Sequence, residues 1–402
     1  MPTRQAFGEE LRRRRTARKM TQGVAARGLG VQRATLTQWE SGTHLPSAEK
    51  VRAADDYFGA RGALIALADA ARTGAAPHAA PRKLTLDEVF IAVGRTLRAR
   101  LQPAEGDRPP GWCHDLAQRA TPTPLSTAYG IRTLLMLDGP GVDLRPLARF
   151  IWHRHGEGGW VIRHAGPPRP EATAAMVDAL TRVALDVDLD DAWCGLERSV
   201  DDHARAHPFV LCVVLETAAR FRPTEPFTAQ LVDHLLAARR RFDDAELWPA
   251  NATVDPRRIE PSMVHTARAV AALRAAQHQL HRDDVAEAVD QAVRWITDTE
   301  QDDGVTEVLR PDPANRSADV PINHFTAAWV VRALAGHPGV PGPRMNAALQ
   351  RLWDSYLPDD ALWGWKHDGQ IPLWMAHDAV AALRAAALAG FPTPVVVPTA
   401  GE

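Results

Sequence analysis

Apolar residues in the first 60 positions recur at the spacing of short amphipathic helices. Phe7 and Leu11 lie one helical turn apart, and Leu36 and Trp39 mark the inward face of a helix predicted over 32–40. A later helix is predicted to begin at Ser47 and to carry the apolar residues Val51, Ala54 and Phe58, and another is predicted to span 60–71. The pattern therefore predicts a small domain of five helices.

Capping residues mark where these helices begin and end. Thr21 stands at an N-cap position ahead of a helix over 22–27, where its hydroxyl can accept a free amide. Gly30 supplies the left-handed turn that ends this helix. Ala25 and Ala26 are small enough to let a second helix cross closely.

A different pattern recurs in the remaining 320 residues. A proline precedes a helix with small residues and a Leu-rich end six times, at intervals of 38 to 60 residues: Pro124, Pro170, Pro208, Pro261, Pro321 and Pro372. Another apolar-periodic helix precedes each copy. Loops rich in Gly or Trp lie between the two helices: 111–112, 158–160, 247–248, 303–305 and 363–365, whereas 201–207 lacks an aromatic residue. Proline is favoured at the first position of a helix because its fixed backbone φ angle already matches the helix.

Twelve helices in six hairpins predict a closed (α/α)6 barrel. The fold class is all-α, with domains predicted at 1–72 and 84–392, a linker at 73–83 and a tail at 393–402. A generic helical solenoid is the alternative. The unequal spacing and the Trp loops favour the closed ring.

The charge is divided unevenly between these parts. Of the 47 Lys and Arg and 49 Asp and Glu residues, ten basic and four acidic residues fall in the first 50, a net charge of +6, which leaves −8 for the rest. This asymmetry indicates a nucleic-acid-binding end on an acidic body, although the basic run 12–15 is equally consistent with a solvated helix face.

The composition and the apolar runs of the chain also indicate its cellular compartment. No apolar run approaches the roughly 18–20 residues that span a bilayer, and the amino terminus lacks the apolar core of a secretory signal. The three cysteines are widely spaced, which argues for a reducing compartment without disulfides. We expect a cytoplasmic protein with no membrane span.

The amino-terminal pattern resembles the lambda-repressor-like (XRE-type) helix-turn-helix family. The residues that carry the resemblance are Leu11, Met20-Thr21-Gln22, Ala25, Leu29-Gly30-Val31, Thr35-Leu36, Trp39-Glu40, Gly42 and Pro46-Ser47. The resemblance implies that helix 32–40 enters the major groove of double-stranded DNA as half of a homodimer. A helical module used only for protein contacts is the alternative.

What the resemblance implies for single residues follows from their positions. Arg33, Ala34, Thr37 and Gln38 would face bases, while Gln22 and Thr43 would contact phosphates. Gln32 departs from the family, which usually has a small hydroxyl residue there to cap the recognition helix. We therefore expect weaker capping, with Gln32 itself within reach of DNA.

The carboxyl-terminal strings 150–160 and 295–304 resemble the QW-type repeats of the squalene cyclase and protein prenyltransferase superfamily. Asp188-Leu-Asp-Asp191 has the letters of the acid motif of terpene cyclases, but it follows an inner helix instead of opening one, so we interpret it as helix-terminal charge. Cys212, His265 and His324 are a candidate zinc set on the prenyltransferase analogy, and hydrogen-bonded histidines are the alternative.

Inner-helix starts cluster at one end of such a barrel and predict a ligand cavity there. Its candidate residues are Trp160, Glu171, Thr173, His265, Asn323, His324, Trp329, Trp365, His377 and Asp378. The alternative is that the tryptophans only join the repeats.

The sequence favours a DNA-binding regulator whose toroid binds a small apolar or amphipathic ligand or dimerises. A terpenoid-cyclase or prenyltransferase-type enzyme stays open, and no motif requires a cofactor.

Overall fold

The computed structural model divides the chain into two units, each with its own core. One unit comprises Met1–Leu84 with Val396–Glu402, and the other comprises Thr85–Val395. The structure describes residues 3–60, 62–73, 83–137, 141–161, 168–255, 257, 259–300, 306–309, 320–365, 369–391 and 395–396. The linker predicted at 73–83 and the tail predicted at 393–402 lie mostly outside these residues, as does the loop 303–305.

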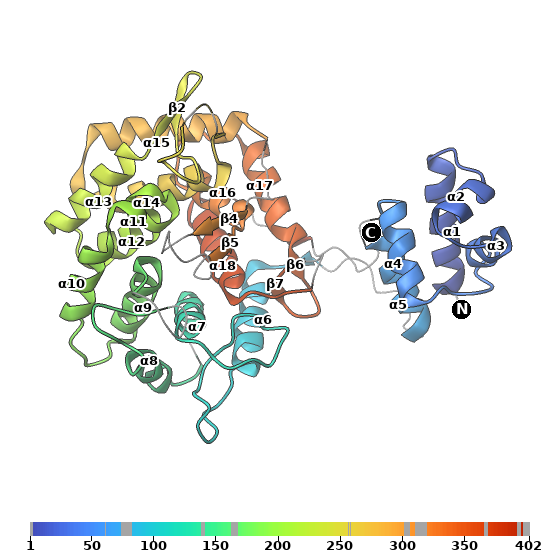
Figure 1. Cartoon of the computed structure of the whole chain (residues 1–402), viewed down its shortest axis with the longest axis horizontal. Helices are drawn as coiled ribbons and strands as arrows, with labels where there is room; N and C mark the ends of the chain where they lie inside the picture. Colours follow the sequence, from blue (N-terminus) through green and yellow to red (C-terminus); the bar gives the residue numbers. More distant parts are fainter. Residues whose placement is uncertain are drawn as a thin grey trace. The chain divides into compact units, whose positions relative to one another are not determined.

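Five helices form the amino-terminal unit (Figure 1), as the apolar spacing predicts. They are α1 (Thr3–Ala17), α2 (Gln22–Gly28), α3 (Arg33–Glu40), α4 (Ala48–Tyr57) and α5 (Ala63–Thr73). Phe7, Leu11, Leu36 and Trp39 are buried together in its core. A close approach of α1 to the end of α3 requires Gly8, because a Cβ there would lie 2.6 Å from the Glu40 carbonyl oxygen.

Twelve helices form a closed ring of hairpins in the second unit, which confirms the predicted (α/α)6 barrel. The inner helices are α7 (Pro124–Met136), α9 (Pro170–Val183), α12 (Pro208–Phe221), α14 (Met263–Leu280), α16 (Thr326–Ala335) and α18 (Leu373–Leu388). Each inner helix contacts the next, and α18 contacts α7, so the ring closes (Figure 1).

The outer helices precede their inner partners along the chain. They are α6 (Leu86–Ala99), α8 (Arg145–Trp152), α10 (Asp190–Ser199), α13 (Pro226–Ala237), α15 (Asp283–Asp298) and α17 (Gly342–Asp354). Outer helices bury one stripe, such as Val285, Val289 and Ile296 of α15, whereas α9 is buried continuously from Pro170 to Leu180. One-sided and all-round burial thus distinguish the two layers.

Short antiparallel pairs of strands complete the unit. They are β2 (Arg240–Phe242) with β3 (Ala245–Leu247), β4 (Thr306–Leu309) with β5 (Val320–Asn323), and β6 (Tyr356–Leu357) with β7 (Leu362–Trp363). A fourth two-stranded sheet is not one of these pairs: it joins β1 (Lys83–Leu84) and β8 (Val395–Val396), at the two points where the chain passes from one unit to the other. Among the described helices, none combines the length and hydropathy needed to cross a membrane.

Three tryptophans join outer to inner helices by one repeated arrangement, here called the Trp–Thr clip. The indole N–H of Trp112, Trp160 and Trp248 donates to a backbone oxygen of the preceding outer helix, at 2.7–2.8 Å. The backbone N–H of the same tryptophan donates to the threonine at the fourth position of the next inner helix, Thr127, Thr173 or Thr266. Each clip satisfies buried polar groups at a loop.

Two loops depart from this arrangement. Where the sequence lacks an aromatic residue, a one-turn helix, α11 (Asp202–Ala206), begins with Asp201 accepting from the Ala204 N–H at 2.9 Å. The indole of Trp363 makes no hydrogen bond to a described residue and packs instead on Tyr356, with ring centroids 5.0 Å apart.

Candidate functional site

The turn between α2 and α3 is built as its caps predict. Thr21 accepts from the Val24 N–H, and Gly30 takes a φ of +63°. Gln32 is the N-cap of α3 and gives no side-chain cap hydrogen bond. The amides of the first turn of α3, which have no partner within the helix, therefore receive no hydrogen bond from the cap side chain.

One face of α3 is exposed and carries the residues predicted to read bases. Arg33, Ala34, Thr37 and Gln38 are all exposed, while Leu36 and Trp39 are buried on the opposite face. The Thr37 hydroxyl lies 3.0 Å from the Arg33 carbonyl oxygen and 3.3 Å from Gln22 Oε1. Thr43 is exposed in the following loop, with its hydroxyl 2.7 Å from Ser41 Oγ.

A buried carboxylate fixes the placement of α3. Glu40 accepts from Arg15 of α1 at 2.6 Å and 3.0 Å and from the Gln22 amide of α2 at 2.8 Å. The Arg15–Glu40–Gln22 network thus ties three helices together, and bidentate Arg–carboxylate pairs are among the strongest polar contacts. This network uses one Gln22 N–H and leaves the other N–H of the amide for a further partner.

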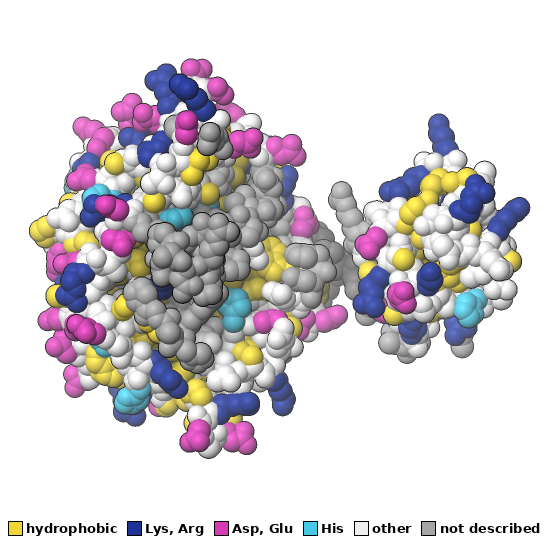
Figure 2. All heavy atoms as spheres, viewed as in Figure 1, with side chains coloured by type: hydrophobic (Ala, Val, Ile, Leu, Met, Phe, Trp, Pro, Cys, Tyr) yellow, Lys and Arg dark blue, Asp and Glu magenta, His cyan; other side chains and the backbone are white. Residues whose placement is uncertain are grey.

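The amino-terminal unit has exposed basic side chains. Arg27, Arg33 and Lys19 are exposed and form no ion pair with any described residue. Figure 2 shows lysine and arginine side chains spread over the amino-terminal unit with few acidic ones between them. A surface of this kind attracts a polyanion.

The toroid has a cavity of about 330 Å³ at the N-terminal ends of its inner helices. Its walls combine four aromatic side chains with several polar ones. The lining consists of His114, Leu125, Ser126, Tyr129, Glu171, Phe209, Arg268, Ile322, Asn323, Trp365, Gln370, Pro372, Trp374 and Asp378. Aromatic walls with a few convergent polar groups are typical of small-molecule pockets.

The structure brings together some of the residues predicted from the sequence. Glu171, Asn323, Trp365 and Asp378 line the cavity. The other six predicted residues are absent from its lining: Trp160, Thr173, His265, His324, Trp329 and His377. Trp160 and Thr173 form a Trp–Thr clip, so their polar atoms join helices α8 and α9.

The candidate zinc histidines lie beside each other in the core. His265 and His324 stack edge-to-face with ring centroids 4.9 Å apart, and His265 Nδ1 lies 2.7 Å from Ser262 Oγ. Within the part of the chain that the structure describes, no group of three or more His, Cys, Asp or Glu residues is arranged to hold a metal ion.

Trp329 and His377 surround the carboxylate of Asp378. The Trp329 indole donates to Asp378 Oδ2 at 2.9 Å, and His377 Nδ1 lies 3.1 Å from Asp378 Oδ1. Burial lowers the pKa of His377 to about 4, against the Asp378 carboxylate that favours its charge. His377 is therefore neutral at pH 7 and donates its Nδ1 proton to Asp378.

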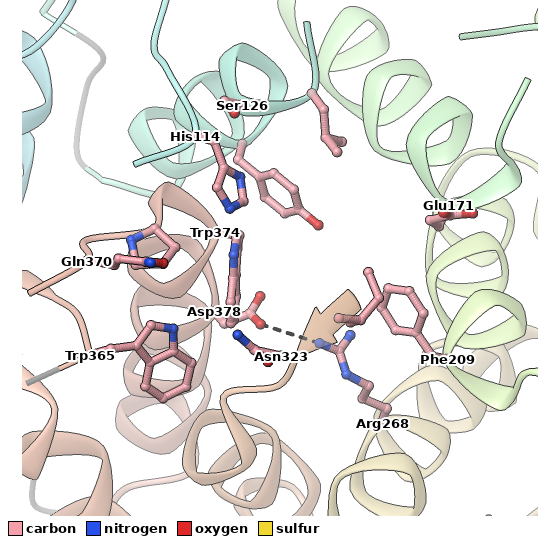
Figure 3. Close-up of a pocket in the computed structure, with 14 residues that line it drawn as sticks. His114, Ser126, Glu171, Phe209, Arg268, Asn323, Trp365, Gln370, Trp374 and Asp378 are labelled. Atoms are coloured by element: carbon pink, nitrogen blue, oxygen red, sulfur yellow. Dashed lines mark ion pairs between the residues drawn. The ribbon is translucent and has the colours of Figure 1, made fainter. Parts of the chain in front are cut away.

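Arg268 lines the cavity beside this carboxylate. The residue is only 5% exposed, and its Nη2 lies 3.7 Å from Asp378 Oδ2. The guanidinium also lies over the rings of Trp329 and Phe209, at 3.9 Å and 4.9 Å from their centroids. Burial lowers its pKa. Figure 3 shows the guanidinium directed toward Asp378 inside the cavity, with Phe209 nearby.

Arg268 belongs to a set of charged residues, here called the inner charge layer, of which only Asp378 was predicted from the sequence. The layer takes one charged residue from each inner helix, and these residues are Arg132, Asp178, Glu216, Arg268, Arg332 and Asp378. They pair as Arg132–Asp178, Arg332–Glu216 at 3.0 Å and Arg268–Asp378 at 3.7 Å. A charged residue flanked by apolar residues in the middle of a helix, such as Arg332 in the run 329–335, is the sequence signal that could have found them.

Residues 188–191, which match the acid motif of terpene cyclases, lie away from the cavity. Asp190 and Asp191 open the outer helix α10, and Asp190 pairs with Arg222 while 81% of its side chain is exposed. Their position matches the interpretation of helix-terminal charge. An exposed carboxylate lacks the apolar surroundings that hold a catalytic acid protonated.

Comparison with known proteins identifies the first unit. Residues 6–68 match the family model of the helix-turn-helix domain. The amino-terminal unit is a helix-turn-helix domain. The presence of this domain supports the prediction that the protein is a DNA-binding regulator. No curated protein matches the chain.

Solved structures resemble the chain only distantly. The α-1,6-mannanase GH76A from Salegentibacter sp. HEL1_6 is 10% identical over 75% of this chain and 99% of its own, with a TM-score of 0.47. The apo form of the competence regulator ComR from Streptococcus vestibularis is 11% identical over 97% of this chain and 100% of its own, with a TM-score of 0.26. Neither likeness assigns an activity or a ligand, and the terpenoid-cyclase resemblance stays a prediction.

Proposed function

We propose that this protein is a sequence-specific transcriptional regulator of the XRE type that reads DNA with α3. The observation that carries the proposal is the exposed row of Arg33, Ala34, Thr37 and Gln38 on a helix held in place by the Arg15–Glu40–Gln22 network. A rigid helix with exposed polar side chains in its first two turns suits the major groove.

The chemistry of each side chain gives its proposed role. Arg33 pairs bidentately with guanine, Gln38 with adenine, and the Ala34 methyl contacts thymine. Gln22 offers its second amide N–H to a phosphate, with Thr43 on the neighbouring loop. Gln32, whose side chain caps nothing, reaches the same DNA.

The toroid supplies the regulatory input in this proposal. Its cavity of about 330 Å³ falls at the lower end of the roughly 300–1,000 Å³ of small-molecule sites. A ligand that binds one conformation of the protein better than another shifts operator affinity by that difference. We propose that the protein acts as a homodimer, because one helix-turn-helix touches few base pairs.

Selection of bound duplexes from a random pool by the full-length protein tests the proposal. We expect enrichment of one half-site repeated with two-fold symmetry, its centres about 10 base pairs or a multiple apart. Repeating the selection with small molecules from a cell extract should change the recovery of the enriched duplex. If no duplex is preferred at moderate salt, the protein does not read sequence.

A further inference from the structure

The toroid cavity contains one buried cation whose donors are largely unused. The Arg268 Nε–H is buried without a hydrogen-bond partner among the described residues, and its separation of 3.7 Å from Asp378 exceeds a hydrogen bond. Leaving a buried charged donor unsatisfied is costly, and such groups are rare. We infer that the ligand of this cavity is a small carboxylic acid with a ring-containing apolar body, whose carboxylate pairs with Arg268. The inference deepens the proposed ligand-binding role of the toroid and rests on it.

The carboxylates near Arg268 are already engaged by other donors. Asp378 accepts from Trp329 and His377, one on each oxygen, at 2.9 Å and 3.1 Å. Glu171, on another wall, pairs with Arg169 at 2.6 Å. A planar guanidinium presents its N–H groups as a fork that matches an incoming carboxylate, so this geometry favours an acid.

The helices around the cavity favour the same charge. Ser126, Glu171, Phe209 and Trp374 each lie in the first turn of an inner helix, α7, α9, α12 or α18, and all four line the cavity. Helix N-termini carry partial positive charge, and their fields add where several converge on one site. An anion is therefore attracted to the mouth as well as to Arg268.

The walls define the rest of the ligand. Tyr129, Phe209, Trp365 and Trp374 line the cavity, and Trp365 and Trp374 have ring centroids 6.2 Å apart. Aromatic surfaces of this size match flat apolar bodies. The volume of about 330 Å³ suits one or two rings.

Binding of matched probes to the full-length protein tests the inference. The probes are 1-naphthylacetate and phenylacetate, their neutral amides, and 2-(1-naphthyl)ethylamine, measured by calorimetry at neutral pH. We expect each acid to bind at least about tenfold more tightly than its amide, because only the acid offers a charged acceptor to the unused N–H groups of Arg268. The amine should bind most weakly.

Two variants connect the preference to Arg268. Arg268→Met should remove the preference for acids, and Arg268→Lys, which keeps the charge but loses the fork, should retain part of it. Arg332→Met is the matched control, since Arg332 lies 4.1 Å from the same Trp329 ring but does not line the cavity. It should leave the acid preference unchanged.

Several outcomes overturn the inference. They are equal binding of acid and amide, preference for the amine, no binding of either acid at millimolar concentration, or an acid preference that survives in Arg268→Met. If the Arg268 variants do not fold, the acid and amide affinities of the unmodified protein decide alone. Operator affinity with and without bound acid separates the two proposals: an acid that binds through Arg268 and leaves DNA affinity unchanged contradicts the regulatory role while the acid site stands.

Discussion

Arg33 stands in the first turn of α3 with its side chain exposed and no ion pair to any described residue. It therefore loses no internal partner when it is replaced. We predict that Arg33→Ala weakens binding to the selected operator by about 1–3 kcal/mol and relaxes the preference at a single base pair. Titration of labelled operators that differ at one position measures both effects.

Arg52→Ala provides the control for this change. Arg52 is exposed on α4 and also lacks an ion pair among the described residues, but it lies outside the recognition helix. Replacing Arg52 should weaken DNA binding less than replacing Arg33 does, and by the same amount for all duplexes. A uniform loss in Arg33→Ala as well would mean that Arg33 contacts only the DNA backbone.

Exposed residues were easier to predict than buried polar ones. The base-facing side chains of α3 follow from helical periodicity, since Leu36 and Trp39 define the opposite face. The role of Glu40 does not follow, because its partners Arg15 and Gln22 come from two other helices. The sequence predicts that Thr173, at an inner-helix start, and Trp160, near it, bind ligand, but it does not tell which way these side chains point.

The start of each inner helix could be predicted because proline acts locally. Pro124, Pro170 and Pro208 occupy the first position of α7, α9 and α12, where a missing N–H costs nothing. Pro372 is an N-cap and Pro321 lies in β5, so the recurring proline marks the region and not one fixed position. The one-turn helix α11 was not predicted, because a five-residue helix has too few turns to show periodicity.

Helix α9 offers a test of the Trp–Thr clip. Thr173→Val removes the hydroxyl that accepts the Trp160 N–H at 3.1 Å and leaves that buried amide unsatisfied. We expect the free energy of unfolding of the toroid to fall by about 1–3 kcal/mol. Urea denaturation measures the loss, and binding of cavity ligands should be unaffected by it.

Thr181→Val on the same helix is the control. The Thr181 hydroxyl is buried and makes no hydrogen bond with the residues that the structure describes. The same substitution there removes an unsatisfied group, so stability should stay equal or rise. Equal losses in the two variants would show that the clip hydrogen bond adds nothing beyond the effect of valine in the helix.

At the scale of the whole molecule, ring closure brings together charges that are remote in sequence. Glu216 and Arg332 are 116 residues apart and pair across α14, which lies between their helices in the ring. The sequence predicts that the ring exists, since the hairpins repeat. It does not predict which charges meet inside, because that depends on the rotation of every inner helix about its axis. The inner charge layer and the place of Arg268 in the cavity therefore came only from the structure.

The inner ring also makes the two units differ in their response to acid. Burial and the charge of Arg132 lower the pKa of His377 from 6.5 to about 4, although Asp378 opposes the shift. Between these values the unfolded chain binds a proton that the folded toroid refuses, so stability is lost as the pH falls from about 6.5 to about 4. The loss from His377 reaches about 3 kcal/mol. The described histidine of the helix-turn-helix domain, His44, is exposed.

We therefore predict that mild acid unfolds the toroid before the helix-turn-helix domain. Hydrogen exchange of the full-length protein, followed separately in the two units across this range, measures the order. Burial also lowers the pKa of His114, His155 and His234, so the slope of toroid stability against pH contains their contributions too. His377→Asn isolates one of them: it should lower stability at neutral pH through the lost packing yet flatten the slope between about pH 6.5 and about pH 4. A slope that is unchanged in this variant would mean that the folded and unfolded chains take up the His377 proton over the same pH range, so that burial in the ring does not exclude the charged imidazole.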